Sequence, residues 1–376
     1  MTQRNLVRFL ILLLHGTFWL PFLQARLLQG QAVSSEPLNL IVQIDGQVKV
    51  KRQGWTAYAP VVFGTALHGG DLLNLSESSR AKVVCSDLTL HDVPTGIGGV
   101  PCSVSRVVLR RVDGTLINAT RGWPSDGSFP VVLSPRKTKL ITANPTLRWS
   151  PVKEATAYRV TVRGEGGKDR LGWSKMVTSL TAIVYPETAP RFEVGIDYKL
   201  IVETNDGRSS EEPGLGLGFS MLSSNEKKIV LQEQKQIEKW GLPDGPTQFL
   251  VAHLYADHGL YAEAIERLEV ISQTFKAAAV KRLLGDLYMD VGLARQAEAE
   301  YLNSLVLSKA ENDDEGQMLL HKALAYIYEQ IVGNKEAAAL QFNATLDLAK
   351  KLGDDLTATQ ARMQLEQLKS PVAPLE

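Results

Sequence analysis

The sequence is poor in the side chains that usually build metal and redox sites. Its 376 residues include only two cysteines and six histidines. His253 and His258 are five residues apart, whereas two ligands on one helix face need a spacing of about four. Cys85 and Cys102 have no partnered histidines, so they do not make a zinc site. We therefore expect no metal and no cofactor in this chain.

Catalytic signatures are missing as well. The chain has neither a Gly-x-Ser-x-Gly sequence nor a Ser/His/Asp order typical of hydrolases. A glycine-rich segment at 96–99 precedes a proline and a cysteine rather than a helix, so it cannot offer helix-terminal amides to a phosphate. Asp313-Asp314 and Asp354-Asp355 precede predicted helices, where capping explains them. We expect no catalytic residues, and an unrecognised constellation, such as that of a hydrolase of envelope polymers, is the alternative.

A net charge of one sign is also missing. Basic and acidic residues each number 41, so the formal net charge is zero. Residues 226–376 carry 16 basic and 23 acidic residues, and residues 33–225 carry 22 and 18. An acidic excess in the C-terminal part is typical of a solvated helical surface. This balance gives no case for a nucleic-acid partner.

One apolar run stands at the N-terminus, and no second run approaches the length of a membrane-spanning helix. Arg4 and Arg8 precede about 15 apolar residues, a pattern typical of signal peptides. We expect residues 1–32 to be a signal peptide, cleaved before Val33, and the chain to be exported to the periplasm, the cell surface or the medium. Cleavage after Ala25 and an uncleaved N-terminal anchor are the alternatives. Apart from that anchor, we expect no membrane contact.

Short alternating apolar runs fill residues 37–117 and predict a small β-domain. The first two runs surround Asp45-Gly46, a turn signal, and predict a hairpin. Cys85 and Cys102 flank a turn-rich segment of this domain. An exported chain can oxidise them, so we expect a disulfide, with two free thiols as the alternative.

The order of residues in this segment resembles the extracytoplasmic domain of FecR-type proteins. A Gly-x-Val-x-Val run, a tryptophan, a leucine followed by Gly-Asp, a serine-rich turn and an apolar strand follow one another: Gly46, Val48, Val50, Trp55, Leu67, Gly70, Asp71, Ser78, Ala81 and Val83. The chain departs from the family at Ser86-Asp87-Leu88, where Asp-Gly is frequent. It also has only about eight residues before the apolar run, where FecR-type transducers carry a cytoplasmic anti-sigma segment. The resemblance therefore implies an exported β-module rather than control of a sigma factor.

Residues 118–130 are rich in glycine, proline and serine and predict a linker. The next segment, 131–222, has several apolar strands separated by turns, and its strand sequences resemble a fibronectin type III-like sandwich. By that resemblance Trp149, Tyr158 and Tyr198 are core residues, with Tyr198 at the tyrosine corner. A connecting helix is predicted at 225–241, capped by Asn225.

The stretch 246–350 contains three similar segments that resemble tetratricopeptide repeats, which are antiparallel helix pairs stacked into a solenoid. Each has a small residue in its first helix, a tyrosine three positions later, a turn, and a second helix with an alanine and then a large residue. The small residues are Ala252, Gly285 and Ala325, and the large ones are Leu268, Tyr301 and Phe342. The last repeat is longer, and we expect the sequence ENDDEG to lengthen the loop before it. A final helix at 354–369 would cap the solenoid.

Mapped through the repeat pattern, the residues one turn from each small residue would line a concave groove. They are Phe249, His253, Arg282, Asp286, Met289, Lys322, Tyr326 and Glu329. The set mixes aromatic residues with both signs of charge and lacks the row of Lys, Arg and Asn that would suit a C-terminal carboxylate, so we expect a peptide or protein segment with mixed contacts. The groove is short, and docking of the β-domains of this same chain is the alternative.

The fold class predicted is multidomain: two small β-domains, FecR-like and fibronectin III-like, followed by an all-α tetratricopeptide solenoid. The function predicted is a non-enzymatic interaction scaffold of the bacterial envelope that binds a protein partner. The alternative is a membrane-anchored regulatory protein that senses a ligand through the FecR-like part and relays it through the solenoid.

Overall fold

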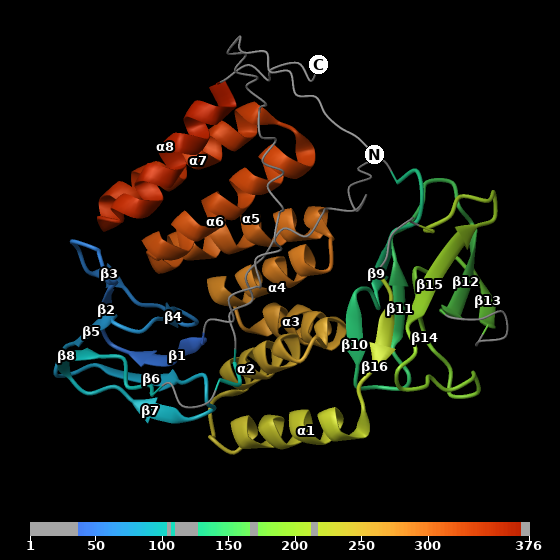
Figure 1. The fold of residues 1–376 in the computed structure, drawn as a ribbon, viewed down its shortest axis with the longest axis horizontal. Coiled ribbons are helices and arrows are strands. Elements are labelled where there is room, and N and C mark those ends of the chain that lie inside the picture. The colour runs from blue at the N-terminus through green and yellow to red at the C-terminus, as the bar shows by residue number, and fades with distance from the viewer. Residues whose placement is uncertain (1–36, 104–106, 110–126, 166–171, 212–216, 370–376) are drawn as a thin grey trace, which may run out of the picture. The chain divides into compact units, whose positions relative to one another are not determined.

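β structure occupies the first part of the described chain and helices occupy the rest, which confirms the predicted order (Figure 1). The computed structural model describes residues 37–103, 107–109, 127–165, 172–211 and 217–369. The predicted signal peptide, residues 118–126 of the predicted linker and the tail from 370 lie outside these ranges. None of the helices among the described residues is both long and apolar enough to cross a membrane. The described residues all belong to one compact unit.

The first β region, residues 37–109, contains two four-stranded antiparallel sheets with the orders β4-β1-β6-β7 and β3-β2-β5-β8. Its strands are β1 Asn39–Asp45, β2 Val48–Lys51, β3 Ala59–Pro60, β4 Ala66–Leu67, β5 Leu72–Leu75, β6 Arg80–Val84, β7 Leu90–Asp92 and β8 Gly96–Gly99. Alternate residues of these strands face one core, in which Ile41, Val50 and Val83 are fully buried. The predicted disulfide is present between Cys85 and Cys102, whose Cα atoms are 5.4 Å apart.

The predicted hairpin around Asp45-Gly46 is wrong, because β1 and β2 lie in different sheets. The turn itself forms, and Gly46 takes a φ of +88° that suits glycine. The amide of Gln47, directly before β2, donates to Ser79 Oγ, directly before β6, at 2.8 Å. β1 pairs instead with β6, with Ile41 opposite Val83. Both outcomes have the same apolar alternation, so the pattern could not separate them.

The second β region, residues 127–222, contains a five-stranded sheet of order β10-β16-β15-β12-β13 and a three-stranded sheet of order β14-β11-β9. Its strands are β9 Val132–Ser134, β10 Thr138–Leu140, β11 Thr146–Trp149, β12 Ala157–Gly164, β13 Gly172–Thr178, β14 Ala182–Val184, β15 Tyr198–Thr204 and β16 Phe219–Met221. Both sheets contribute to one core, which contains Trp149, Tyr158 and Tyr198 as predicted. The amide of Glu193, five residues earlier in the chain, donates to Tyr198 Oη at 2.8 Å.

Helices fill the chain from Ser224 to Lys369. They are α1 Ser224–Glu238, α2 Asp244–Asp257, α3 Tyr261–Thr274, α4 Ala278–Asp290, α5 Ala294–Glu311, α6 Asp314–Tyr326 with a π-helical continuation Ile327–Val332, α7 Lys335–Leu352 and α8 Asp355–Lys369. Ser223 rather than Asn225 caps α1, since Ser223 Oγ accepts from the amide of Glu226 and the Glu226 carboxylate accepts from the amide of Ser223.

The helices after α1 pack in consecutive pairs, α2 with α3, α4 with α5 and α6 with α7. Gly259, Gly292 and Gly333 lie at the turns within the pairs, with φ between +73° and +76°. Gly285 of α4 lies directly against the ring of Tyr301 in α5, where an added Cβ would come within 2.5 Å of a ring carbon. A small residue at this position lets the two helices approach each other.

The prediction that ENDDEG lengthens a loop is wrong. Only Asn312 and Asp313 separate α5 from α6, and the rest of that sequence is helical. The extra residues instead lengthen the helices, because α5 has 18 residues and α3 has 14. The first helix of the last pair is lengthened too, by the π-helical segment that follows Tyr326.

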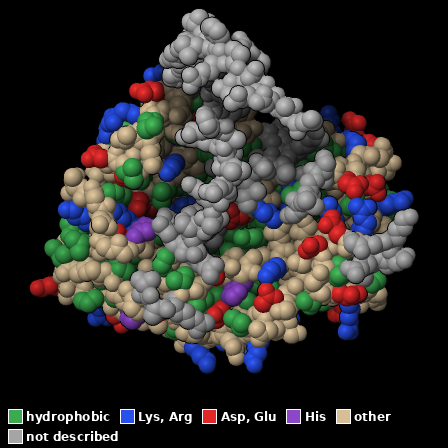
Figure 2. All heavy atoms as spheres, in the orientation of Figure 1, with side chains coloured by type: hydrophobic (Ala, Val, Ile, Leu, Met, Phe, Trp, Pro, Cys, Tyr) green, Lys and Arg blue, Asp and Glu red, His purple; other side chains and the backbone are tan. Residues whose placement is uncertain are grey.

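Basic and acidic side chains are interspersed over the described residues on the face shown in Figure 2, as a net charge of zero would suggest. Beneath the surface, the three regions share apolar cores. One core joins Leu38 and Leu40 of the first β region to α2, α3 and α4. Another joins the two sheets of that region to Met318, Leu346 and Ala361 of the last helices. The first β region therefore has no separate core of its own.

Candidate functional site

A cavity of about 460 Å³ lies between the helices and the first β region. We call it the chamber. Seven of the eight residues predicted for the groove line it: Phe249, His253, Arg282, Asp286, Met289, Lys322 and Tyr326. The eighth, Glu329, lies on the π-helical segment and is not among its lining residues. The residues that the repeat pattern assigned to one groove therefore lie, with one exception, around one cavity of the structure.

Four helices line one side of the chamber, α2, α4, α5 and α6, and three of them carry the predicted groove residues. α2 contributes Phe249 and His253, which are four residues apart, and α4 contributes Arg282, Asp286 and Met289, at spacings of four and then three residues. Residues three, four and seven apart lie on one helix face, so each helix presents a single stripe to the cavity. Lys322 and Tyr326 of α6 extend the wall.

The first β region forms the opposite wall, mainly through the turn between β3 and β4, residues 61–65. The ring of Phe63 packs between two aromatic rings, with its centroid 5.0 Å from that of Phe249 in α2 and 4.9 Å from that of Phe275, which directly follows α3. Gly64 follows with φ +77°, and a Cβ added to it would lie 2.2 Å from the Cβ of Ala279. Part of the predicted groove is thus covered by the chain itself, as the docking alternative expected.

A buried ion-pair network closes one side of the chamber. Arg52, which is 8% exposed, pairs with Asp71 of the same region and bridges to Glu315 of α6. Both guanidinium contacts to Glu315 are short, Nε to Oε1 at 3.0 Å and Nη2 to Oε2 at 2.7 Å. Bidentate arginine–carboxylate pairs are strong and geometrically specific. This network fixes the first β region to the start of α6.

The second β region contacts the end of α4 and the side of α3. Arg136 Nε donates to the carbonyl of Val291, and Lys137 Nζ donates to that of Asp290, each at 2.8 Å. Cations at a helix C-terminus satisfy its last carbonyls and interact favourably with the helix dipole. Arg148 also makes a bidentate contact with Glu269 of α3 at 2.6 and 3.1 Å. These contacts position the helix that carries Arg282 and Asp286.

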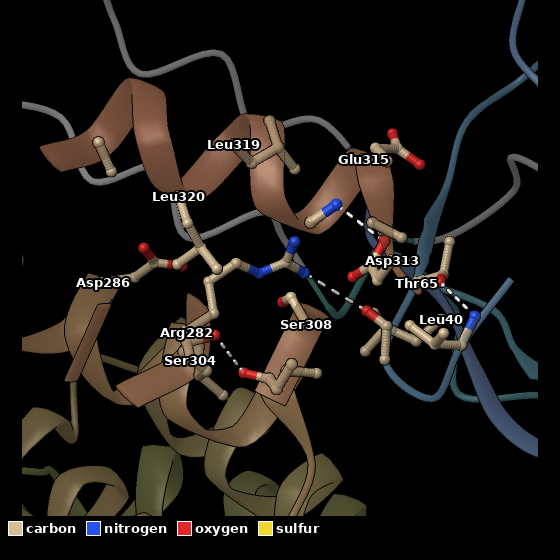
Figure 3. A pocket seen from close by; sticks show the side chains of 18 of the residues that line it. Leu40, Thr65, Arg282, Asp286, Ser304, Ser308, Asp313, Glu315, Leu319 and Leu320 are labelled. Carbon is tan, nitrogen blue, oxygen red and sulfur yellow. Dashed lines mark hydrogen bonds between the residues drawn. The ribbon is translucent and has the colours of Figure 1, made fainter. Parts of the chain in front are cut away.

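The polar groups of the chamber are unevenly satisfied (Figure 3). Asp286 accepts a hydrogen bond from Tyr301 Oη at 2.8 Å, and Asp313 accepts one from the amide of Gly316 at 2.8 Å. The guanidinium of Arg282 has one long contact, from Nη2 to the carbonyl of Gly64 at 3.5 Å. Ser308 Oγ is buried and has no hydrogen-bond partner within the described parts of the chain. Arg282 and Ser308 therefore have fewer short hydrogen bonds within the described residues than the two carboxylates.

His253 lies deep in the chamber wall, with its ring edge-on to Phe249 at 4.7 Å between centroids. Its Nδ1 atom is buried without a hydrogen-bond partner among the described residues. Burial, together with the nearby charge of Arg282, lowers the pKa of His253 to about 3. The imidazole is therefore neutral at ordinary pH and belongs to the wall rather than to a charged binding group.

We expect the buried His253 to make the free energy of unfolding depend on pH in mildly acidic solution. Because its folded pKa of about 3 lies below the usual 6.5, the unfolded chain binds a proton between these values that the folded chain does not. Stability is therefore lost as pH falls below 6.5. From pH 6.5 to 5 the free energy of unfolding should fall by about 2 kcal/mol more in the parent than in His253→Leu. Urea unfolding at both pH values measures this difference.

Within the described residues, no group of three or more His, Cys, Asp or Glu side chains is arranged to hold a metal ion. A second cavity of about 70 Å³ lies where α3 and α4 meet the second β region, beside Arg148 and Glu269. At that size it has room for a few waters at most. The chamber is accordingly the candidate site of this chain.

Sequence reasoning missed the residues of the opposite wall: Arg52 and the turn at 61–65. No local pattern marks them, because each is defined by a contact with a helix more than 180 residues later, as in the 263-residue separation of Arg52 and Glu315. The sequence gives one weak indication of this wall. Arg52 is a charged residue that directly follows the Val48–Lys51 strand, with no acidic residue next to it in the sequence.

Comparisons with known proteins add little. No protein-family profile matches the chain, and no curated protein matches it. Matches among solved structures include the crystal structure of BtubC (BKLC) from P. vanneervenii. That protein is 18% identical, with a TM-score of 0.20, and the match covers 41% of this chain and 78% of that chain. A likeness of this size supports no statement about the fold or function of the present chain.

Proposed function

We propose that this chain is an exported, non-enzymatic interaction protein whose partner binds at the chamber. The observation that carries the proposal is the chamber itself, where seven groove residues from three helices line one cavity. Concave cavities with apolar walls and a few convergent polar groups are the usual sites of ligand binding. Absence of a recognisable catalytic motif in the sequence makes binding, rather than chemistry, the function proposed.

The helical region is proposed to be a three-repeat tetratricopeptide solenoid capped by α8. Support comes from the consecutive helix pairs, the glycine turns and the contact of Gly285 with Tyr301. The second β region is proposed to be fibronectin III-like, on the strength of its two sheets with one core and the hydrogen bond from the Glu193 amide to Tyr198. A FecR-like identity for the first β region is supported by its sequence pattern.

Export to a bacterial envelope is proposed from the apolar N-terminal run behind Arg4 and Arg8. The disulfide between Cys85 and Cys102 supports an oxidising compartment. N-terminal sequencing of the mature protein tests the route: a start at Val33 agrees with cleavage, and an intact N-terminus contradicts it.

A pull-down with the full exported chain tests the partner proposal. The double variant Arg282→Glu/Lys322→Glu reverses two chamber cations and is expected to reduce recovery of a partner at least tenfold. Lys309→Glu, which reverses an exposed charge of α5 outside the chamber, is the matched control. Equal recovery by all three proteins would rule out the chamber as the partner site.

A second candidate is the regulatory receptor, in which the first β region senses a ligand and passes the signal to the helices. The observation in its favour is the direct coupling of the two by Arg52–Glu315 and Phe63. It requires an uncleaved anchor, so the sequencing experiment distinguishes it from the scaffold.

A further inference from the structure

The strand β8, Gly96–Gly99, forms a free edge of the first β region. It is the last strand of the sheet β3-β2-β5-β8, so β5 is its one strand neighbour within the described residues. All four of its residues are exposed, and Ile97 is 67% exposed. Figure 1 places β8 at the outer margin of this region. Residues 93–103 contain no charged side chain. β8 therefore presents an uncharged row of backbone amides and carbonyls to its surroundings.

The other sheet edges of the described residues are covered, charged or shorter. β3 packs against α6 and β10 against α3, while β4 and β9 contribute Ala66 and Leu133 to the core shared with the helices. β7 carries Asp92, and β13 carries the exposed Lys175. β14 is uncharged, but it has three residues and no glycine. Cover and charge are common ways in which proteins prevent an edge strand from pairing with another chain. β8 has neither.

Two glycines of β8 are not required by the fold of a single chain. Gly96 has a φ of +89°, so glycine suits the start of the strand. Gly98 and Gly99 do not take such a φ, and nothing lies within 4 Å of the position that a Cβ would occupy at either residue. Glycine within a strand weakens it, because it adds backbone freedom and no side chain that packs. In strands, such glycines often mark a place where another backbone approaches closely.

One face of this edge has a side chain and a gap that match each other. Ile97 lies opposite Asn74 and Gly99 lies opposite Leu72, and residues two apart share one face of a sheet. Ile97 and Leu72, which is 41% exposed, project from this face, whereas Gly99 leaves a gap beside Leu72. A second β8 that runs antiparallel, with Gly98 opposite its own copy, places Ile97 opposite Gly99 of the second copy. Each Ile97 then fills the gap beside Leu72 of the other copy.

We propose that β8 pairs antiparallel with β8 of a second copy of this chain, which joins two four-stranded sheets into one sheet of eight strands. Strand addition of this kind gives hydrogen-bond partners to the backbone groups of both edges. The pairing brings no like charges together, because the segment is uncharged. It is separate from the chamber, since β8 contributes no lining residue there. The interface is small, so the dimer is weak and reversible.

Sedimentation equilibrium of the full exported chain tests the proposal directly. The weight-average mass should rise from that of a monomer towards that of a dimer between about 5 µM and about 500 µM, as expected for a small interface. Hydrogen exchange over the same concentrations should slow at least threefold in β8 and stay unchanged in β14, the other uncharged edge.

Charge at Gly98 tests the register, because the two-fold axis places this residue opposite itself. A side chain there has open space in the single chain. Gly98→Lys and Gly98→Glu should each weaken association at least tenfold through like charges, and an equimolar mixture of the two should restore it. Val184→Lys, Val184→Glu and their mixture are the matched control, since Val184 is 61% exposed on β14, and they should change nothing. Far-UV circular dichroism confirms that each variant is folded.

Three results would overturn the proposal: a monomer at every concentration, association that folded Gly98 variants leave undiminished, or a loss of association that the mixture does not restore. Hydrogen exchange on the parent chain keeps the test valid if a Gly98 variant unfolds, because exchange in β8 that does not depend on concentration is equally decisive. A foreign strand bound at β8 of a chain that stays monomeric would assign this edge to a different partner and also contradict the proposal.

Discussion

Replacing Gly64 with alanine is expected to lower the free energy of unfolding by about 2–5 kcal/mol and to loosen the first β region from the helices. Two effects combine. The residue has a φ of +77°, which costs an L-amino acid about 1–2 kcal/mol. In addition, a new Cβ would lie 2.2 Å from that of Ala279, a distance that the packed wall cannot accommodate without movement. Urea unfolding measures the loss, and hydrogen exchange in α2 and α4 measures the loosening.

The chain supplies a matched control for this variant. Gly54 has a φ of +86°, but nothing lies within 4 Å of the position its Cβ would occupy. Gly54→Ala should therefore lose only about 1–2 kcal/mol, the cost of the backbone strain alone. A double-mutant cycle with Ala279→Gly isolates the contact, and we expect a favourable coupling of about 1–3 kcal/mol. Equal losses for Gly54→Ala and Gly64→Ala, with no coupling, would mean that the contact is unimportant.

Replacing Arg52 with methionine is expected to lower the free energy of unfolding by about 3–5 kcal/mol, because it removes the guanidinium that pairs with Asp71 and Glu315. Asp71 is 2% exposed and Glu315 is 14% exposed, so neither can regain full hydration. The control is Lys82→Met, which removes the partner of Asp92, a carboxylate that is 82% exposed. Surface pairs of that kind contribute about 0–1 kcal/mol.

Replacing Asp71 and Glu315 with their amides tests whether their charges cause the loss of stability. The triple variant Arg52→Met/Asp71→Asn/Glu315→Gln should recover most of the stability, since uncharged groups cost less to bury. The effect should also depend on pH. Burial opposes the shift, but hydrogen bonds from His68 and the charge of Arg52 lower the pKa of Asp71 below 3.8. The stability that this carboxylate contributes is therefore present above pH 3.8 and is lost as pH falls through the folded pKa. A triple variant no more stable than Arg52→Met would refute this explanation.

The helices were predictable because their information is local. Helical spacing and turn glycines such as Gly259 and Gly292 are contained within each short segment, and the structure places turns at both. The same spacing gathered Phe249, Arg282 and Lys322 at one cavity. A periodic pattern specifies a helix face, and stacking of similar helix pairs then aligns those faces.

Errors arose where a local pattern fitted two outcomes equally well. The alternation around Asp45-Gly46 is the same whether β1 pairs with β2 or with β6, and the structure pairs β1 with β6, 35 or more positions later in the chain. The polar sequence ENDDEG suits a loop, but it also suits the end of one helix and the start of the next. The structure has the second arrangement, with Asp313 as the N-cap of α6. The wall formed by residues 61–65 could not be predicted, since its contacts lie far along the sequence.

The shared core of the first β region has a consequence for how the chain is made. Residues 37–109 are synthesised before the helices, yet their apolar faces are covered by Met318, Leu346 and Ala361. Arg52 likewise forms its ion pair with Glu315 only after a residue 263 positions later has been synthesised. Contacts of such long range slow folding and leave apolar surface exposed meanwhile. A nascent or truncated chain that ends before α6 would therefore present this surface to chaperones, to proteases and to other unfinished copies of itself.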